Sequence, residues 1–470
     1  MLSLKTLRLA GFLMVSCLVA IAGYGQNTDT SVRIRSILLE GNKVTRPQII
    51  LRELTFAEGD TMDSDQWSRL KESSRNNLLN TSLFNYVTID SIPLDAHQWD
   101  VRIHMEERWY TWPMPIFELA DRNFNVWWKT KDLSRTYYGL YLVRYNFRGR
   151  KETVTFRVRL GYSEQYRLAY SIPYINKKQT SGLQFSFAFS RNREVTYNSE
   201  AGIPLFYKDE GLYPRQNLSA DLAYTHRKNI YTTHSFLVKY SNIQISDTLM
   251  QLNPEYLGEE RKHLEYMSLS YNFRHDHRDF KPYPLKGYFI DLELVKMGLG
   301  VFADQSVDHS YAVTTIKGFK QLSNRWFAAG SFSAKLSDAS RQPFVIQRGL
   351  GYGNLYVRAY ELKVADGQNF WLTRGNLKFA LIQPFIKTFS FIPAPKFNKV
   401  SLALYANVFC DAGYVRDPRG YYDGPLTNTL MTGYGAGLDL VTYYDKVLRI
   451  EYAFDRFGEN GIFLHFTAPI

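Results

Sequence analysis

A short stretch of the chain, His275, Asp276, His277, Arg278 and Asp279, contains residue types that could bind a metal ion. Alternate residues of a β-strand project to the same face, so His275 and His277 would lie side by side as imidazole ligands. Arg278 would repel a cation, however, and the prolines that follow favour a turn. We therefore expect a structural turn, and we keep a metal site serving a barrel enzyme as the alternative.

Two glycine-rich runs, 349–353 and 433–437, share only their glycine spacing with phosphate-binding loops. A phosphate loop needs a helix N-terminus behind it, and no helical pattern follows either run. Glycines at strand bends are the better interpretation. The chain also lacks a Gly-x-Ser-x-Gly nucleophile motif, and its nine histidines are scattered. We therefore expect no enzymatic activity, no cofactor and no resident metal ion.

Composition narrows the class of protein. Aromatic residues make up 16% and hydrophobic residues 45% of the 470 residues, yet the mean hydropathy is −0.31. So many aromatic residues argue against disorder, and beyond the N-terminus no apolar run reaches the roughly 18 residues of a spanning helix. Two cysteines exclude a disulfide scaffold. The formal net charge of +12 comes from cations spread along the chain, so we expect no nucleic-acid partner.

Residues 1–25 have the pattern of a secretory signal peptide. Lys5 and Arg8 precede an apolar run from Leu9 to Ile21, and small residues follow it. The run is short for a retained membrane anchor, which is the alternative. We expect the mature chain to begin near residue 26, outside the cytoplasm.

From Pro113 onward the chain alternates large apolar residues with small or polar ones. In residues 183–190 every odd position, including Phe185 and Phe187, is large and apolar. A strand with this pattern has one apolar and one wet face, as in a soluble sandwich or in a membrane β-barrel with a polar lumen. The length of residues 113–470 favours the barrel, because it accommodates about sixteen membrane strands with their connections. Tyr and Trp near strand ends fit the aromatic girdles of such barrels, with cross-strand aromatic pairs as the alternative.

Residues 31–108 follow a different, β-α-α-β-β pattern. Strands are expected at Val32–Leu39, Tyr86–Ile92 and Asp100–Met105, and helices at Arg46–Leu54 and Ser64–Leu79. The predicted fold is mainly β: one N-terminal α+β domain followed by a transmembrane antiparallel β-barrel of about sixteen strands.

The N-terminal region resembles a polypeptide-transport-associated (POTRA) domain, with a generic small α+β domain as the alternative. The residues that carry the resemblance are Ile37, Leu38, Leu39, Glu40, Gly41, Asn42, Thr45, Gly59, Asp60, Leu83, Phe84, Glu107 and Arg108.

The segment behind it resembles the barrel of BamA/TamA-type outer-membrane insertases and translocases. Four landmarks occur in the order that this family shows. They are a strand-end motif of Asp276, Arg278, Asp279 and Gly287, a loop motif of Val357, Arg358, Ala359 and Tyr360, the run 409–413 and the run 433–437. The chain departs from the family in having one POTRA domain, and in having Ala359 where the family has Gly. A methyl group fits poorly where φ is positive, so the loop motif could take a different conformation here.

The resemblance implies a role for Arg358 of the loop motif. This residue would lie at the tip of a long loop folded into the lumen and would form a salt bridge with Asp411. Independently of the family, an arginine in an apolar-rich barrel must be paired or wet, because a buried unpaired charge costs several kcal/mol. A solvated loop arginine is the alternative.

The C-terminal segment resembles the β-signal of outer-membrane barrels, with Gly461, Leu464 and Phe466 as its marker residues. Leu464, Phe466 and Ile462 would share one strand face. The chain runs on to Ile470 instead of ending on an aromatic residue.

These features lead us to expect an outer-membrane protein with its POTRA domain in the periplasm, acting in the assembly or translocation of other proteins. Client outer-membrane or secreted polypeptides would bind by β-augmentation at the strand Tyr86–Ile92, or at a seam between Pro115–Ala120 and Gly461–Thr467. Outer-membrane lipid and periplasmic accessory proteins are further expected partners. A passive porin-like channel and a barrel enzyme remain the alternatives.

Overall fold

The computed structural model describes residues 31–95, 97–119, 136–209, 211–302, 307–338, 342–390, 398–417, 424–442 and 446–466. The predicted signal peptide lies outside the described residues, as do Ala120 and Thr467 at the ends of the two predicted seam strands. No helix within the described ranges is both long and apolar enough to cross a membrane.

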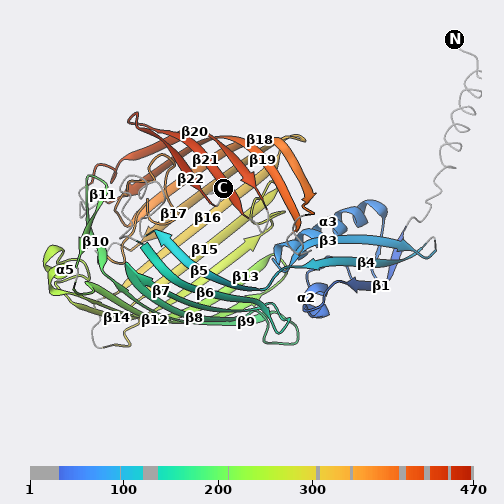
Figure 1. The fold of residues 1–470 in the computed structure, drawn as a ribbon, viewed down its shortest axis with the longest axis horizontal. Helices are drawn as coiled ribbons and strands as arrows, with labels where there is room; N and C mark the ends of the chain where they lie inside the picture. The colour runs from blue at the N-terminus through green and yellow to red at the C-terminus, as the bar shows by residue number, and fades with distance from the viewer. Residues whose placement is uncertain are drawn as a thin grey trace, which may run out of the picture.

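The N-terminal region forms a four-stranded sheet with two helices (Figure 1). The strand order is β2-β1-β4-β3, so β3 is an edge strand. The longer helix begins where the Asp63 carboxylate accepts a hydrogen bond from the Gln66 N–H (2.7 Å), and it buries Trp67 and Leu78 in the domain core. The elements are β1 (Val32–Glu40), α2 (Pro47–Leu51), β2 (Thr61–Met62), α3 (Ser64–Asn80), β3 (Phe84–Pro93) and β4 (Gln98–Glu107). The predicted order of elements is confirmed except for β2, whose two residues are too few to show a period.

The rest of the described chain forms one antiparallel sheet of sixteen strands, which confirms the predicted strand number and fold class. Strand order follows the sequence, except that β9 pairs directly with β12. The strands are β5 (Thr111–Leu119), β6 (Thr136–Phe147), β7 (Glu152–Gly161), β8 (Ser163–Ile172), β9 (Ser181–Asn192), β12 (Arg215–Arg227), β13 (Thr232–Ile245), β14 (His263–Asp276), β15 (Gly287–Met297), β16 (His309–Gln321), β17 (Trp326–Ser337), β18 (Asn369–Thr388), β19 (Lys399–Arg416), β20 (Leu430–Val441), β21 (Val447–Asp455) and β22 (Asn460–His465).

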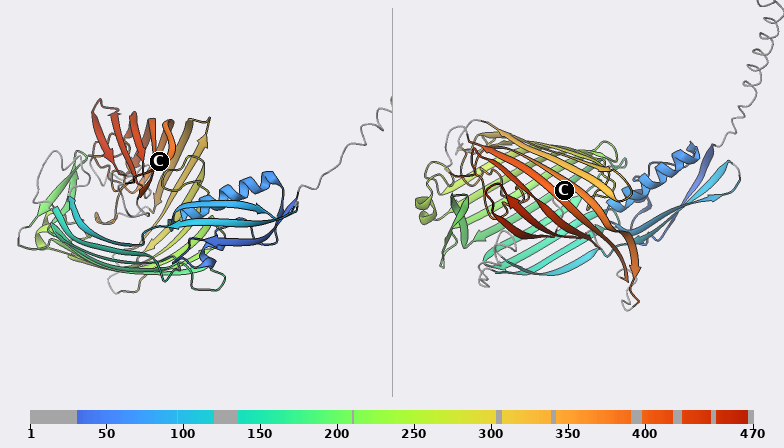
Figure 2. Two further views of the ribbon diagram at one scale, coloured as in Figure 1. Left: turned by 45° about the vertical axis from the view of Figure 1, so that its right-hand side comes forward. Right: turned by 90° about the horizontal axis from the view of Figure 1, so that it is seen from above.

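The sixteen-stranded sheet curls strongly, with the N-terminal domain at one end (Figures 1 and 2). A hairpin of β10 (Glu194–Glu200) and β11 (Ile203–Lys208), together with the short helix α5 (Asp247–Leu252), lies at the opposite end. Neither the hairpin nor α5 was expected, although β10 and β11 carry a short alternation of apolar residues, Val195 with Tyr197 and Ile203 with Leu205. The two edge strands of the large sheet are β5 and β22.

Side chains alternate across the sheet as the sequence pattern predicts. Phe185 and Phe187 of β9 are exposed, whereas Ser186 between them is buried and donates a hydrogen bond to Asp221 of β12 (3.0 Å). The apolar residues therefore face outward and the polar ones face the lumen.

Candidate functional site

The connection between β17 and β18 runs inside the curled sheet, and we call its described part, residues 342–368, the lumen loop. Isolated bridges fold the lumen loop back on itself, from Leu350 to Ala365 and from Tyr352 to Leu355. A cluster of buried apolar side chains fixes it to the sheet. The cluster contains Leu350, Val357, Tyr360 and Ala365 of the lumen loop and Phe370, Leu372, Val415, Leu426 and Met431 around it.

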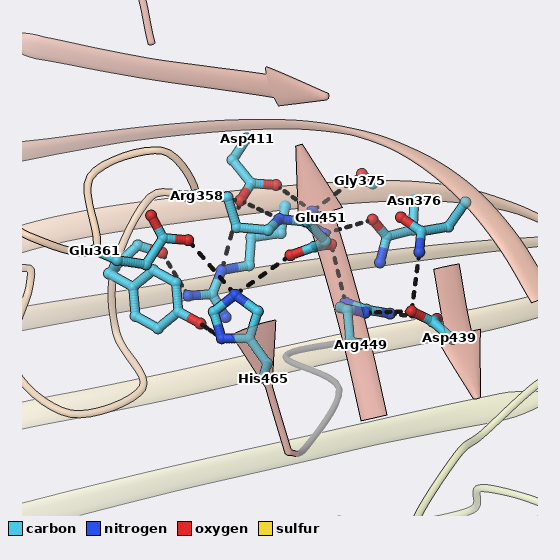
Figure 3. Close-up of polar contacts among 12 residues, drawn as sticks. Arg358, Glu361, Gly375, Asn376, Asp411, Asp439, Arg449, Glu451 and His465 are labelled. Carbon is cyan, nitrogen blue, oxygen red and sulfur yellow. Dashed lines mark hydrogen bonds and ion pairs between the residues drawn. The ribbon is translucent and has the colours of Figure 1, made fainter. Parts of the chain in front are cut away.

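Arg358 lies at the centre of this site with 0% of its surface exposed. Its guanidinium donates to both carboxylate oxygens of Asp411 on β19, at 2.6 and 2.8 Å, and to Asn376 of β18 at 2.9 Å (Figure 3). Glu451 of β21 accepts a further hydrogen bond at 3.1 Å, and the ring of Phe409 lies 3.8 Å from the guanidinium carbon. Arg358 is therefore buried and paired, so the solvated loop arginine is not what the structure shows.

A second buried arginine extends the network along the barrel wall. Arg449 donates to both carboxylate oxygens of Asp439 on β20, at 2.6 and 2.7 Å, and lies 3.5 Å from Glu451. The hydroxyl of Tyr283 also donates to Asp439, at 2.7 Å. Because Glu451 contacts both Arg358 and Arg449, strands β19, β20 and β21 and the lumen loop share one continuous set of ion pairs. Sequence reasoning missed the members other than Arg358 and Asp411, because polar residues such as Asp439, Arg449 and Glu451 alternate with apolar ones as any lumen-facing residue does.

The last strand joins this network through His465. Its imidazole lies 3.5 Å from Glu451 and 3.6 Å from Glu361 of the lumen loop. The ring also stacks on Tyr356, whose hydroxyl lies 3.3 Å from Nδ1 of the imidazole. The lumen loop therefore contacts the edge strand β22 directly, a contact that the sequence did not predict.

The loop motif has an unusual backbone. Ala359 adopts a left-handed conformation with φ of 78°, which an alanine rarely takes. Val357 and Tyr360 on either side are buried. Gly433 of β20 lies so close that a Cβ atom there would be 1.9 Å from the Arg358 carbonyl oxygen. Gly433 thus provides room for the lumen loop, whereas Gly435 and Gly437 make room for atoms of the neighbouring strands, such as the Tyr452 carbonyl oxygen.

The strand-end motif forms the turn between β14 and β15. Asp276 accepts two hydrogen bonds of 2.8 Å from Arg278, and the Asp279 carboxylate accepts one from the Leu285 N–H at 3.1 Å. Gly287 has a φ of 97°, and a Cβ atom there would lie 2.0 Å from the His277 carbonyl oxygen. Glycine is therefore needed at position 287, both for its positive φ and for the close approach of the His277 carbonyl oxygen.

The histidines of this turn contact neighbouring side chains. His275 is 2.8 Å from the Thr232 hydroxyl and 3.1 Å from that of Tyr288, and His277 stacks on Tyr231 at 3.9 Å. Within the described ranges no three His, Cys, Asp or Glu side chains converge as a metal site would require.

The N-terminal domain is docked on the turns at the barrel end. Glu53 forms two hydrogen bonds of 2.6 Å with Arg227 at the end of β12. Burial alone would raise the pKa of the Glu53 carboxyl, but Arg227 and the nearby Lys151 lower it to about 2. Asn80 of α3 contacts backbone groups of Asp279 and Lys281, both at 2.9 Å, so the strand-end motif is part of this docking surface.

The C-terminal marker residues lie on β22 or next to it. Ile462 and Phe466 are exposed, whereas Phe463 is buried against Phe409 and Ala453. Leu464 is half-buried, and Gly461 pairs with Ala453 of β21. The apolar face of β22 thus points away from the lumen, and His465 points into it.

Comparisons with known proteins agree with this architecture. A sequence model of the Omp85 superfamily domain matches residues 146–460, and a POTRA model described as a surface antigen variable number repeat matches residues 32–108. No curated protein sequence matches. The fold is similar to the crystal structure of BamA from Haemophilus ducreyi lacking POTRA domains 1–3, with 15% identity, 92% of this chain and 83% of that chain covered, and a TM-score of 0.52. It is also similar to CdiB from Escherichia coli, with 14% identity, 92% and 75% covered, and a TM-score of 0.55. The chain belongs to the Omp85 superfamily.

Proposed function

We propose that this protein is an outer-membrane assembly or translocation factor that receives a client strand by β-augmentation and inserts or passes it at the edges of its barrel. The barrel lies in the outer membrane and the POTRA domain in the periplasm. Membership in the Omp85 superfamily supports insertion or translocation of outer-membrane proteins as the general role. The clients are outer-membrane or secreted polypeptides, with outer-membrane lipid and periplasmic accessory proteins as further partners.

The observation that carries this proposal is the pair of edge strands. Strands β5 and β22 stand at the two ends of the sheet order, and no register joins them within the described ranges. The last strand is also short, because β22 pairs with β21 only from Arg449 to Phe454. An edge strand presents backbone N–H and C=O groups that can pair with another chain. A client strand can therefore extend the sheet at either edge.

The POTRA sheet offers a second edge at β3. The hydroxyl of Tyr86 on β3 donates to the Lys399 carbonyl oxygen at the start of β19 (3.0 Å), and the Lys399 ammonium forms an ion pair with Glu106 of β4. A strand added to β3 would therefore be held beside the periplasmic end of the barrel, which is where a client enters.

The lumen favours this proposal over a passive channel. An open pore needs a wide aqueous path, whereas here the lumen loop crosses the interior and is fixed by buried ion pairs at Asp411 and Glu451. We expect the purified protein in planar bilayers to lack the large, steady conductance of a porin.

In vivo photocrosslinking tests the proposal. A photoreactive residue at Ile462 on the exposed face of β22 should capture newly made outer-membrane or secreted polypeptides, identified by mass spectrometry. The matched control is Leu336 of β17, which is equally exposed (69% for both) but lies in the middle of the sheet. Equal capture at both positions, or capture of lipid alone at Ile462, would contradict the proposal.

A further inference from the structure

A cavity of about 900 Å³ lies between the lumen loop and the barrel wall. Its lining includes Leu464, His465 and Phe466 at the end of β22 and Tyr137 of β6, which pairs with the other edge strand β5. The hairpin β10–β11 also contributes to its wall, so the cavity extends toward the barrel end opposite the POTRA domain. The cavity therefore reaches the zone between the two edges of the sheet, where the lumen is nearest to lipid.

The charge of the cavity wall favours anions. Six charged side chains other than the histidine line the cavity, four of them cationic. They are Arg215, Lys317, Arg348 and Arg374 against Glu194 and Glu361. Such cations bind phosphate groups through charge-assisted hydrogen bonds.

The remaining lining suits a saccharide. Four tyrosines, Tyr137, Tyr162, Tyr256 and Tyr352, are among the lining residues, and Tyr–saccharide contacts are common in such sites because an aromatic ring packs against the apolar face of a sugar. Gln347 also lines the cavity, is almost fully buried, and has no hydrogen-bond partner for either amide atom. Buried unmatched polar atoms are costly, and a polar ligand in the adjoining cavity would satisfy them. A volume of this size also matches that of pockets that enclose a ligand as large as a disaccharide.

We propose that this cavity binds the phosphorylated saccharide headgroup of an outer-membrane glycolipid. The headgroup enters the cavity between β22 and the β5–β6 edge, and the acyl chains stay outside. Phe117 of β5 and Ile462 of β22 are 75% and 69% exposed, so the outer faces of both edge strands are suited to acyl chains. Lys317 and Arg348 contact the phosphates. The inference rests on the proposed location of the barrel in the outer membrane and uses the same two edges, but lipid binding can be measured without a client.

Native mass spectrometry of the full-length protein in detergent micelles tests the site. Bisphosphorylated lipid A should bind as a single adduct. Its dephosphorylated form has no phosphate, and phosphatidylethanolamine has one zwitterionic phosphodiester and no saccharide, so both should bind at least about tenfold more weakly. The Lys317→Gln/Arg348→Gln variant should bind lipid A about tenfold more weakly than the parent. The matched control, Lys320→Gln/Arg325→Gln, changes two exposed cations at the opposite barrel end and should bind like the parent.

Four results would overturn the proposal. One is equal binding of phosphatidylethanolamine, and another is unchanged lipid A binding by the Lys317→Gln/Arg348→Gln variant when its heat-modifiable gel mobility shows a folded barrel. A third is that the acyl-free phosphorylated disaccharide binds and lipid A does not, which would make the ligand a soluble sugar phosphate. The fourth is binding of an unfolded client peptide in place of lipid A, with the same dependence on Lys317 and Arg348.

Discussion

Arg358 can be buried in the lumen only because several acceptors meet its guanidinium. Asp411 binds it through both oxygens, while Asn376, Glu451 and the Gly375 carbonyl oxygen accept from the remaining donors. Burying a charge is costly, and the cost is recovered only when geometry and hydrogen bonds are nearly complete. The residue therefore fixes one position of the lumen loop.

Replacing Arg358→Ala should release the lumen loop without unfolding the sheet. The change removes the closest cation from Asp411 and one of the two arginines beside Glu451, and breaking a buried pair in this way costs about 3–5 kcal/mol. Limited proteolysis should then cut within residues 342–368, while the heat-modifiable mobility of the barrel persists. Arg358→Lys retains one charge but not the two-oxygen geometry, and should give intermediate protection. If the lumen loop of Arg358→Ala resists protease as well as that of the parent protein, the ion pairs do not hold the loop in place.

Ala359→Gly should stabilise the docked loop. A left-handed alanine costs about 1–2 kcal/mol, and the greater freedom of glycine in the unfolded chain offsets part of this. We expect a net gain of about 0.5–1 kcal/mol, measured as slower proteolysis of the lumen loop. Ala329→Gly in β17, which is not among the positive-φ residues, is the control and should be neutral or slightly destabilising. Faster proteolysis of the lumen loop in Ala359→Gly would contradict the claim that the backbone at Ala359 is strained.

At the scale of elements, the lumen loop depends on the shape of the strands behind it. Gly433 allows β20 to approach the Arg358 carbonyl, and Gly413 of β19 similarly makes room for Val357. These glycines lie on neighbouring strands, so the loop fits a hollow formed by β19 and β20 together.

Gly433→Ala should displace the loop although every charge remains. Its Cβ would lie 1.9 Å from a backbone oxygen, which cannot move without shifting Arg358 itself. Protease cleavage in residues 342–368 should match that of Arg358→Ala. Gly318→Ala in β16, where nothing lies within 4 Å of the new Cβ, should behave like the parent. Similar cleavage in both glycine variants would indicate a general effect on the sheet.

Docking of the POTRA domain should weaken in acid. The pKa of docked Glu53 is about 2, below its ordinary value of 4.5, so its contribution is complete above pH 4.5 and is lost as the pH falls toward 2. Ionised Glu53 therefore contributes about 3 kcal/mol to the free energy of docking. With spin labels at positions 69 and 324 in a Cys410→Ser background, the distribution of label-to-label distances should broaden as the pH falls through this window.

Glu53→Gln should give that broadening already at neutral pH and remove its dependence on pH. Glu72→Gln, an exposed residue of α3, should leave the distances unchanged. A pH response that survives in Glu53→Gln would assign it to another group.

Local sequence patterns predicted the secondary-structure elements better than they predicted the contacts between those elements. The period-two alternation predicted strands, because each side chain reports its own face of the sheet, and the length of the segment gave their number of about sixteen. The contact of His465 with Tyr356 joins residues 109 positions apart and depends on the register of the strands between them. No local pattern contains that register, so Arg358 and Asp411 were found only through resemblance, and Glu451 was missed. The strands β10 and β11 and the helix α5 are each six or seven residues long, and a period over so few residues does not distinguish a separate hairpin from a barrel strand.

At the scale of the whole molecule, three features converge at one place. The sheet ends at β5 and β22, the lumen loop contacts β22 through His465, and the large cavity lies beside the same strands. The POTRA domain is docked at the other end and directs its edge strand β3 to the barrel. A client strand would thus be received at one end and released sideways between the two edges.

Locking the two edges together tests this account most directly. In a Cys410→Ser background, cysteine pairs combining Phe117 with Leu464 or Phe466 can form a disulfide when their Cα atoms come within about 7 Å, and the pair that closes also reports the strand register. Insertion of a radiolabelled client barrel into proteoliposomes is then measured before oxidation, after oxidation and after reduction. Each single cysteine variant, treated identically, is the control. The account predicts that insertion is lost when the seam is locked and returns with reductant, whereas full insertion with the seam quantitatively locked would contradict it.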